Sequence, residues 1–82
     1  MIFITVKSPA GRQIYVGRDY SYSYPTGEPI VLQAGTHTFE TVLDGAVDYR
    51  GRVVNVANGT NMDLDLQPVM PPEPTAGGGS SI

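Results

Sequence analysis

The fold is decided by residues 11–45, which read GRQIYVGRDYSYSYPTGEPIVLQAGTHTFETVLDG. A short apolar strand ends in glycine, a tyrosine-rich segment follows, and two further apolar runs are separated by Ala34-Gly35. Short alternating runs between turn residues are typical of β-strands that bury one face. The stretch therefore predicts a small β-sandwich, and it specifies no reaction.

The flanking segments continue the pattern. Ile2–Lys7 alternates with period two, and the runs Gly51–Ala57 and Thr60–Gln67 flank Asn58-Gly59. An Asn-Gly pair is the strongest short-range signal for a two-residue hairpin, because both central residues of that turn need positive φ. Glycine or proline interrupts every window of helical length. We expect an all-β fold: a small antiparallel β-sandwich or open barrel of about six strands.

The phases of these strands predict a single hydrophobic core. Its predicted members are Ile4, Val6, Ile14, Val16, Leu32, Phe39, Leu43, Val54, Val56, Leu64 and Leu66.

The C-terminal segment differs in composition. Residues 68–82 read PVMPPEPTAGGGSSI, and prolines with Gly and Ser favour extended or flexible chain over a packed element. We expect a β-sandwich domain at residues 1–67 and a disordered tail at residues 68–82. A unit this small leaves much of its surface exposed, and the chain has no cysteine to staple it. Its stability must come from the β core or from association with a partner or with copies of itself.

Charge and hydropathy argue against several functions. The chain has five Lys and Arg residues and a net charge of −3, whereas nucleic-acid binding depends on clustered positive charge. No apolar run approaches the ~20 residues that cross a bilayer. The N-terminal stretch alternates and has no basic region ahead of it, so it is predicted to be a strand and not a signal peptide. We expect synthesis in the cytosol, no nucleic-acid partner and no membrane insertion.

Residues that could carry chemistry are few. His37 is the only histidine, and its place on the Phe39 face predicts a partly buried structural role. Asp63 and Asp65 share one strand face, which is predicted to be solvated, and a metal site needs further ligands. We expect no catalytic residue, no metal and no cofactor, and hence no enzyme.

Three tyrosines form the one surface feature with binding potential. At period two, Tyr20, Tyr22 and Tyr24 are expected to point the same way, with the serines between them pointing the other way. Tyrosine provides rigid, amphipathic contact area at interfaces. The row is open to three interpretations: an additional half-buried strand, a protein–protein contact, or a platform that stacks on sugar rings.

Several turn and strand residues resemble the PEGA domain family. They are Ser8-Pro9-Ala10-Gly11, the strand Gln13–Gly17, Thr26-Gly27-Glu28-Pro29, Ala34-Gly35-Thr36-His37, Phe39 and Gly45. The resemblance covers about residues 5–49. It departs from the family at Ala10-Gly11-Arg12, in the longer Tyr-Ser segment, and after Gly45. PEGA domains are small β-sandwich modules of surfaces and envelopes, so the resemblance implies a non-catalytic structural or interaction role.

Two functional classes follow. The first is a non-catalytic structural or protein-interaction β-module, PEGA-like, acting in an envelope system or alone. The second is a phage virion component, such as a capsid-decorating or tail-associated protein, because a short acidic all-β chain suits a subunit that decorates a lattice. In both, the partner is another protein or a second copy of the chain.

Overall fold

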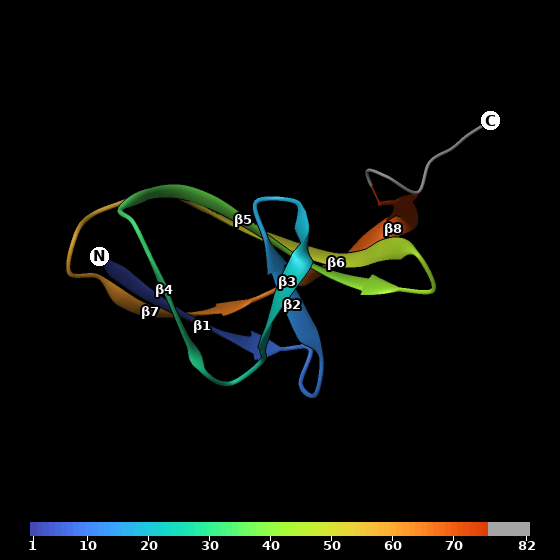
Figure 1. Cartoon of the computed structure of the whole chain (residues 1–82), viewed down its shortest axis with the longest axis horizontal. Coiled ribbons are helices and arrows are strands. Elements are labelled where there is room, and N and C mark those ends of the chain that lie inside the picture. Colours follow the sequence, from blue (N-terminus) through green and yellow to red (C-terminus); the bar gives the residue numbers. More distant parts are fainter. Residues whose placement is uncertain (76–82) are drawn as a thin grey trace.

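The computed structural model describes residues 1–75, which form eight β-strands in two sheets (Figure 1). The strands are β1 (Ile2–Ser8), β2 (Gln13–Val16), β3 (Asp19–Pro25), β4 (Pro29–Leu32), β5 (Gly35–Leu43), β6 (Ala46–Val56), β7 (Asn61–Asp65) and β8 (Gln67–Pro74).

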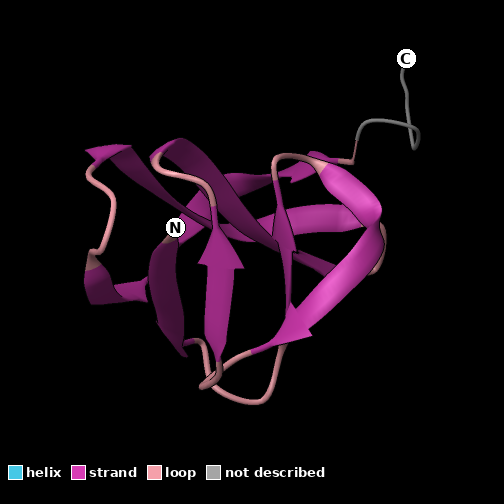
Figure 2. Ribbon diagram, turned by 60° about the vertical axis from the view of Figure 1, so that its left-hand side comes forward, coloured by secondary structure: helices cyan, strands magenta, loops and turns pink. Residues whose placement is uncertain are grey.

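The sheets have three and five strands. The smaller has the order β4-β1-β7, and the larger has the order β3-β2-β5-β6-β8. All pairs are antiparallel except β1 and β7, which run parallel. The long β5–β6 hairpin gives the molecule its 42 × 22 × 22 Å shape (Figures 1 and 2). The predicted all-β fold is confirmed, and the described residues contain no helix. The structure has eight strands where about six were expected, and one of its pairs is parallel.

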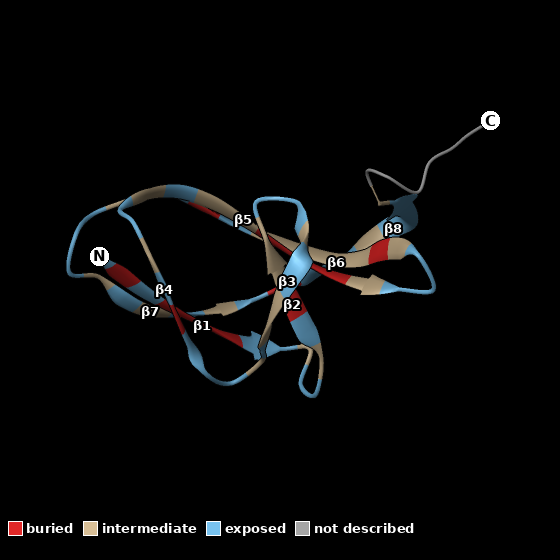
Figure 3. Ribbon diagram, in the orientation of Figure 1, coloured by how far each residue is buried: buried red, intermediate tan, exposed pale blue. Residues whose placement is uncertain are grey.

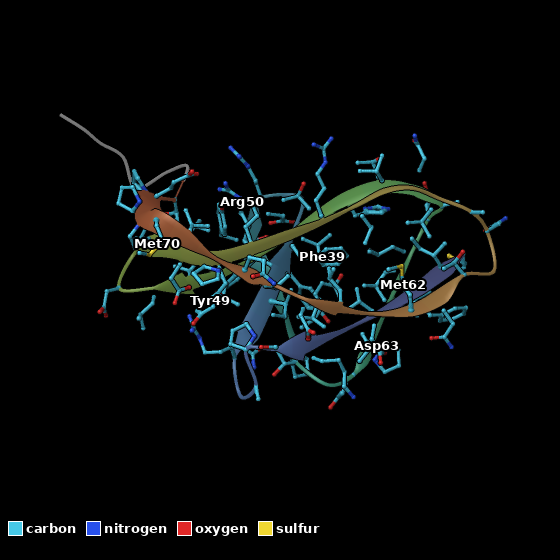
Figure 4. The ribbon with its side chains drawn as sticks, turned by 180° about the vertical axis from the view of Figure 1, so that it is seen from behind. Phe39, Tyr49, Arg50, Met62, Asp63 and Met70 are labelled. Atoms are coloured by element: carbon cyan, nitrogen blue, oxygen red, sulfur yellow. The ribbon has the colours of Figure 1, made fainter. Side chains whose placement is uncertain are left out.

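The core lies between the two sheets (Figure 3). Phe39, at the centre of β5, is completely buried, as its strand phase predicts. It contributes the largest buried side chain, and Figure 4 shows it between the sheets. The other members of the buried cluster are Ile2, Ile4, Val6, Ile14, Ile30, Val53 and Leu66.

Two predicted core residues, Leu43 and Val54, are exposed. Leu43 keeps its phase but lies at the end of β5, next to the Asp44-Gly45 turn and beyond the cluster. Val54 loses its phase because β6 carries one extra residue there: His37 pairs with Val53 and Gly35 with Val56. A β-bulge of this kind lets Val53 and Val56 both face the core and turns Val54 outward.

The prediction of a β-hairpin at Asn58-Gly59 is wrong, because the strands on either side of this turn do not pair with each other. Gly59 has a φ of 88°, whereas Asn58 is not among the residues with positive φ, and Thr60 N donates to Ala57 O at 3.1 Å. These are the features of a type II turn, which splays the strands on either side instead of pairing them. Consequently β6 stays in the large sheet while β7 crosses to the small sheet and pairs with β1.

Part of the expected tail is also a strand. Residues 67–74 form β8 along the free side of β6, whereas the composition of residues 68–82 argued against any packed element. Proline is tolerated here because an edge strand needs no donors on its outer side. The remainder of the expected tail, residues 76–82, lies outside the described residues.

Candidate interaction surface

The β2–β3 hairpin begins the candidate surface. Its turn is Gly17-Arg18, with φ of 65° and 62°, the positive pair that a type I′ hairpin requires. Glycine adopts this conformation freely, but an arginine in it costs about 1–2 kcal/mol. The Arg18 side chain is 62% exposed, and its Nε atom lies 3.9 Å from Glu40 Oε2, so an unfavourable backbone holds a partly exposed guanidinium beside this carboxylate.

The middle of β3 does not pair with β2. Ile14 pairs with Tyr24 and Val16 pairs with Asp19, so that the four residues Tyr20–Ser23 stand opposite Tyr15 alone. We call this segment the β3 arch. An interruption of this size breaks the alternation of side chains between the two faces.

The arch separates the three tyrosines, contrary to the expected row. Tyr24 faces inward with Ile14 and packs against the core, whereas the Tyr20 hydroxyl donates to Glu40 Oε1 at 2.5 Å. Tyr22 is 63% exposed, and its ring meets that of Tyr24 edge to face, with centroids 4.9 Å apart. Tyr20 makes a similar contact with Tyr15, at 5.5 Å. The surface therefore presents one exposed ring, that of Tyr22 in contact with Tyr24, and not a row of three rings.

Glu40 lies at the centre of a hydrogen-bonded group on the outer face of the large sheet, which we call the hub and which consists of Tyr20, Glu40, Arg50 and Glu73. It alternates with Phe39 on β5 and so points away from the core, yet its side chain is 0% exposed. Arg50 Nε donates to Glu40 Oε2 at 2.8 Å, and Arg50 continues to Glu73 on β8 through a bond of 2.6 Å. Figure 4 places Arg50 on the outer side of β6. The hub connects β3, β5, β6 and β8 across the sheet.

These contacts shift the pKa values of the groups around Glu40. Burial, followed by the hydrogen bond to Glu40 and its charge, raises the pKa of Tyr20 to about 12. The hydrogen bond with Glu73 is the main cause that raises the pKa of Arg50, and the Arg50 bond lowers the pKa of Glu73. At neutral pH Tyr20 therefore remains a neutral phenol that donates to Glu40, and Arg50 remains paired with Glu73.

A second polar cluster ties down the base of the hairpin. Asp48 Oδ1 accepts from Thr41 Oγ1 at 2.6 Å and from Arg12 Nη2 at 3.0 Å. Burial opposes ionisation of Asp48, but these two bonds outweigh it and lower its pKa. Asp48 is the extra residue where β6 bulges against β5. Its two side-chain hydrogen bonds therefore hold the bulge to Thr41 on β5 and to Arg12.

The remaining candidate residues lie apart. His37 is half-buried, and its Nε2 atom is 2.8 Å from Gln33 O. Asp63 and Asp65 are exposed on β7. Within residues 1–75, no three His, Cys, Asp or Glu side chains gather where a metal ion could bind, and no pocket is found. No helix in that part of the chain is long and apolar enough to cross a membrane.

Comparisons with family models, curated proteins and solved structures yield no match. The resemblance to PEGA domains therefore rests on the pattern of strand and turn residues alone.

Sequence reasoning identified Tyr22 but missed Glu40 and Arg18. The signal for Glu40 was present as the one carboxylate in Gly35–Leu43, between Phe39 and Thr41. No sequence signal indicated that Tyr20 and Arg50 would cover it, because both pairings depend on the order of strands in the sheet.

Proposed function

We propose that this chain is a non-catalytic protein-interaction β-module, PEGA-like, that contacts its partner through the β2–β3 hairpin. The observation that carries the proposal is the exposed ring of Tyr22, held edge to face on the core-packed Tyr24. Tyrosine and arginine are the residues that most often anchor interfaces. Arg18 supplies the second of these types on the same hairpin.

The hairpin is organised before any partner binds. Tyr20 is bonded to a buried carboxylate, Tyr24 is packed on the core, and Ser21 N and Oγ both donate to Asp19 Oδ1. A surface that is already ordered loses little conformational entropy on binding, which favours affinity. The charged groups of the hub pair with one another, which supports a structural role for them over a catalytic one.

The proposal includes the virion alternative as one case. A capsid-decorating or tail-associated subunit would present the same hairpin to a lattice of other subunits. The partner is either a different protein or a second copy of this chain, so the test must detect both.

Photo-crosslinking tests the proposal. A benzophenone amino acid is placed at position 22, and at position 70 as the matched control, because Met70 is 85% exposed on the opposite edge of the sheet. We expect position 22 to form a discrete adduct in extracts of the cells that produce the protein. Excess wild-type chain should compete for the adduct, and excess Tyr22→Ser chain should not. Equal adducts from both positions, or competition by Tyr22→Ser, would contradict the proposal.

A further inference from the structure

The connection between β6 and β7 brings together the two groups of a known spontaneous reaction. In an Asn-Gly sequence, the glycine amide nitrogen can attack the Asn side-chain carbonyl carbon, because glycine has no side chain to hinder the approach. Asn58 and Gly59 are both exposed in the type II turn, so water reaches them freely.

Met1 holds both reacting groups. Gly59 N donates to Met1 O at 2.8 Å, and Asn58 Oδ1 accepts from the amine of Met1. The next bond in line, Phe3 N to Thr60 O at 2.8 Å, begins the pairing of β1 with β7. Met1 therefore contacts both the attacking nitrogen and the side chain that it would attack.

We propose that Asn58 is a deamidation site, and that the pairing of Met1 with Gly59 controls how fast it reacts. When Met1 separates, Gly59 N loses its proton to water and bonds to Asn58 Cγ, and the side-chain nitrogen leaves as ammonia. The product is a five-membered succinimide. Water then opens the ring at one of its two carbonyls, which gives aspartate or isoaspartate. The net change consumes one water and releases one ammonia, with no oxidant or reductant.

The consequence falls on the end of β1. Aspartate at position 58 would place a carboxylate beside the Met1 amine, whereas isoaspartate adds a backbone atom to the turn. Because β1 is the central strand of the small sheet, a longer turn would disturb the bonds of Met1 and Phe3 to the 58–60 segment. Local opening of the contact between Met1 and Gly59 frees the Gly59 amide, so the reaction records how often this contact opens.

Mass spectrometry with peptide mapping tests the proposal on the full chain. Wild type is incubated folded, incubated in urea, and compared with a chain that begins at Ile2. We expect deamidation at Asn58 and not at Asn55 or Asn61, which precede bulky Val56 and Met62. Folded wild type should react about tenfold more slowly than the other two samples, since two hydrogen bonds protect the site.

Three results would overturn the proposal: no reaction at Asn58 in urea, preferential reaction at Asn55 or Asn61, or equal rates in folded and unfolded wild type. If the chain beginning at Ile2 does not fold, a urea series on wild type replaces it. There, the deamidation rate must rise in parallel with hydrogen exchange of the Gly59 amide below the unfolding midpoint. A deamidation rate that stays flat while this amide opens would equally reject control by Met1.

Discussion

The two edges of the large sheet, β3 and β8, depart from their neighbours in the same way but are held differently. Tyr20–Ser23 stands opposite one residue of β2, and Val69–Pro72, the β8 arch, stands opposite Asp48 of β6. The β3 arch is secured by a buried carboxylate and by ring contacts, whereas β8 is secured by the exposed Glu73 on Arg50. The difference predicts that the β3 arch is the more rigid of the two, because buried partners hold its side chains.

The two arches also discourage sheet-to-sheet pairing by different means. Prolines at positions 68, 71, 72 and 74 remove donors from the β8 edge. The β3 arch contains no proline and carries a large ring, so its departure from the ladder blocks indiscriminate strand addition while it presents one side chain. This makes β3 the edge suited to a specific contact.

Phe39→Ala should have the largest effect and should destroy both edges together. Phe39 pairs with Val16 on the β3 side and with Gly51 on the β8 side, so a cavity there loosens the sheet in both directions. We expect a loss of about 3–5 kcal/mol in the free energy of unfolding. Urea unfolding followed by circular dichroism measures it, and a loss below ~1 kcal/mol would contradict the assigned core.

Glu40→Gln should separate the two edges. The buried carboxylate bonds to Tyr20 and Arg50, and removing its charge leaves these partners poorly satisfied, at a cost of about 1–3 kcal/mol. Glu73→Gln is the matched control with the same change of group at the exposed end of the chain of charges, and it should leave the melting temperature nearly unchanged. Equal destabilisation by the two variants would remove the distinction between the edges.

Truncation after Gln67 tests whether β8 belongs to the fold. Val47 is buried and pairs with Glu73, so removing β8 exposes it and should cost about 1–2 kcal/mol. A disordered tail over residues 68–82 would instead predict no change. Calorimetry of the truncated and full chains distinguishes these outcomes, with truncation after Thr75 as the control that leaves β8 intact.

Tyr20→Phe should have a smaller effect at neutral pH than Phe39→Ala, Glu40→Gln or the truncation, about 1 kcal/mol for one hydroxyl bond. Because the folded pKa of Tyr20 lies above its ordinary value of 10.0, its contribution is complete below pH 10 and is lost as the pH rises through about 12. The tyrosinate absorbance of wild type minus that of the variant should therefore show a transition with its midpoint near 12. A midpoint at 10 would mean that Tyr20 is free of Glu40.

The sequence predicted what depends on local pattern. Alternation identified the strands of the core. Asp44-Gly45, with φ of 52° and 79°, forms a I′ turn between β5 and β6. Asn58-Gly59 has an equally strong local signal but lies where the chain changes sheets, and there packing favours a turn that parts the strands. The same kind of dipeptide thus forms a hairpin at Asp44-Gly45 and, contrary to the sequence prediction, a type II turn at Asn58-Gly59.

The candidate surface was less predictable for the same reason. Period two placed Tyr20, Tyr22 and Tyr24 on one face, and it could not show that β3 would rise opposite Tyr15 and send Tyr20 and Tyr24 to opposite faces. Burial of Glu40 likewise depends on the neighbours that strand order supplies, Tyr20 from β3 and Arg50 from β6. Such long-range placement leaves no mark in a strand's own sequence.

Backbone NMR relaxation tests the central claim, that the β3 arch is a pre-ordered surface and the β8 arch is not. Order parameters of Tyr20–Ser23 should match those of the sheet interior, about 0.85, while Val69 and Met70 should fall below about 0.6. In Glu40→Gln, the values for Tyr20–Ser23 should fall toward those of β8. An equally mobile β3 arch in the wild-type protein would contradict the account, because a flexible Tyr22 could not serve as a preformed anchor.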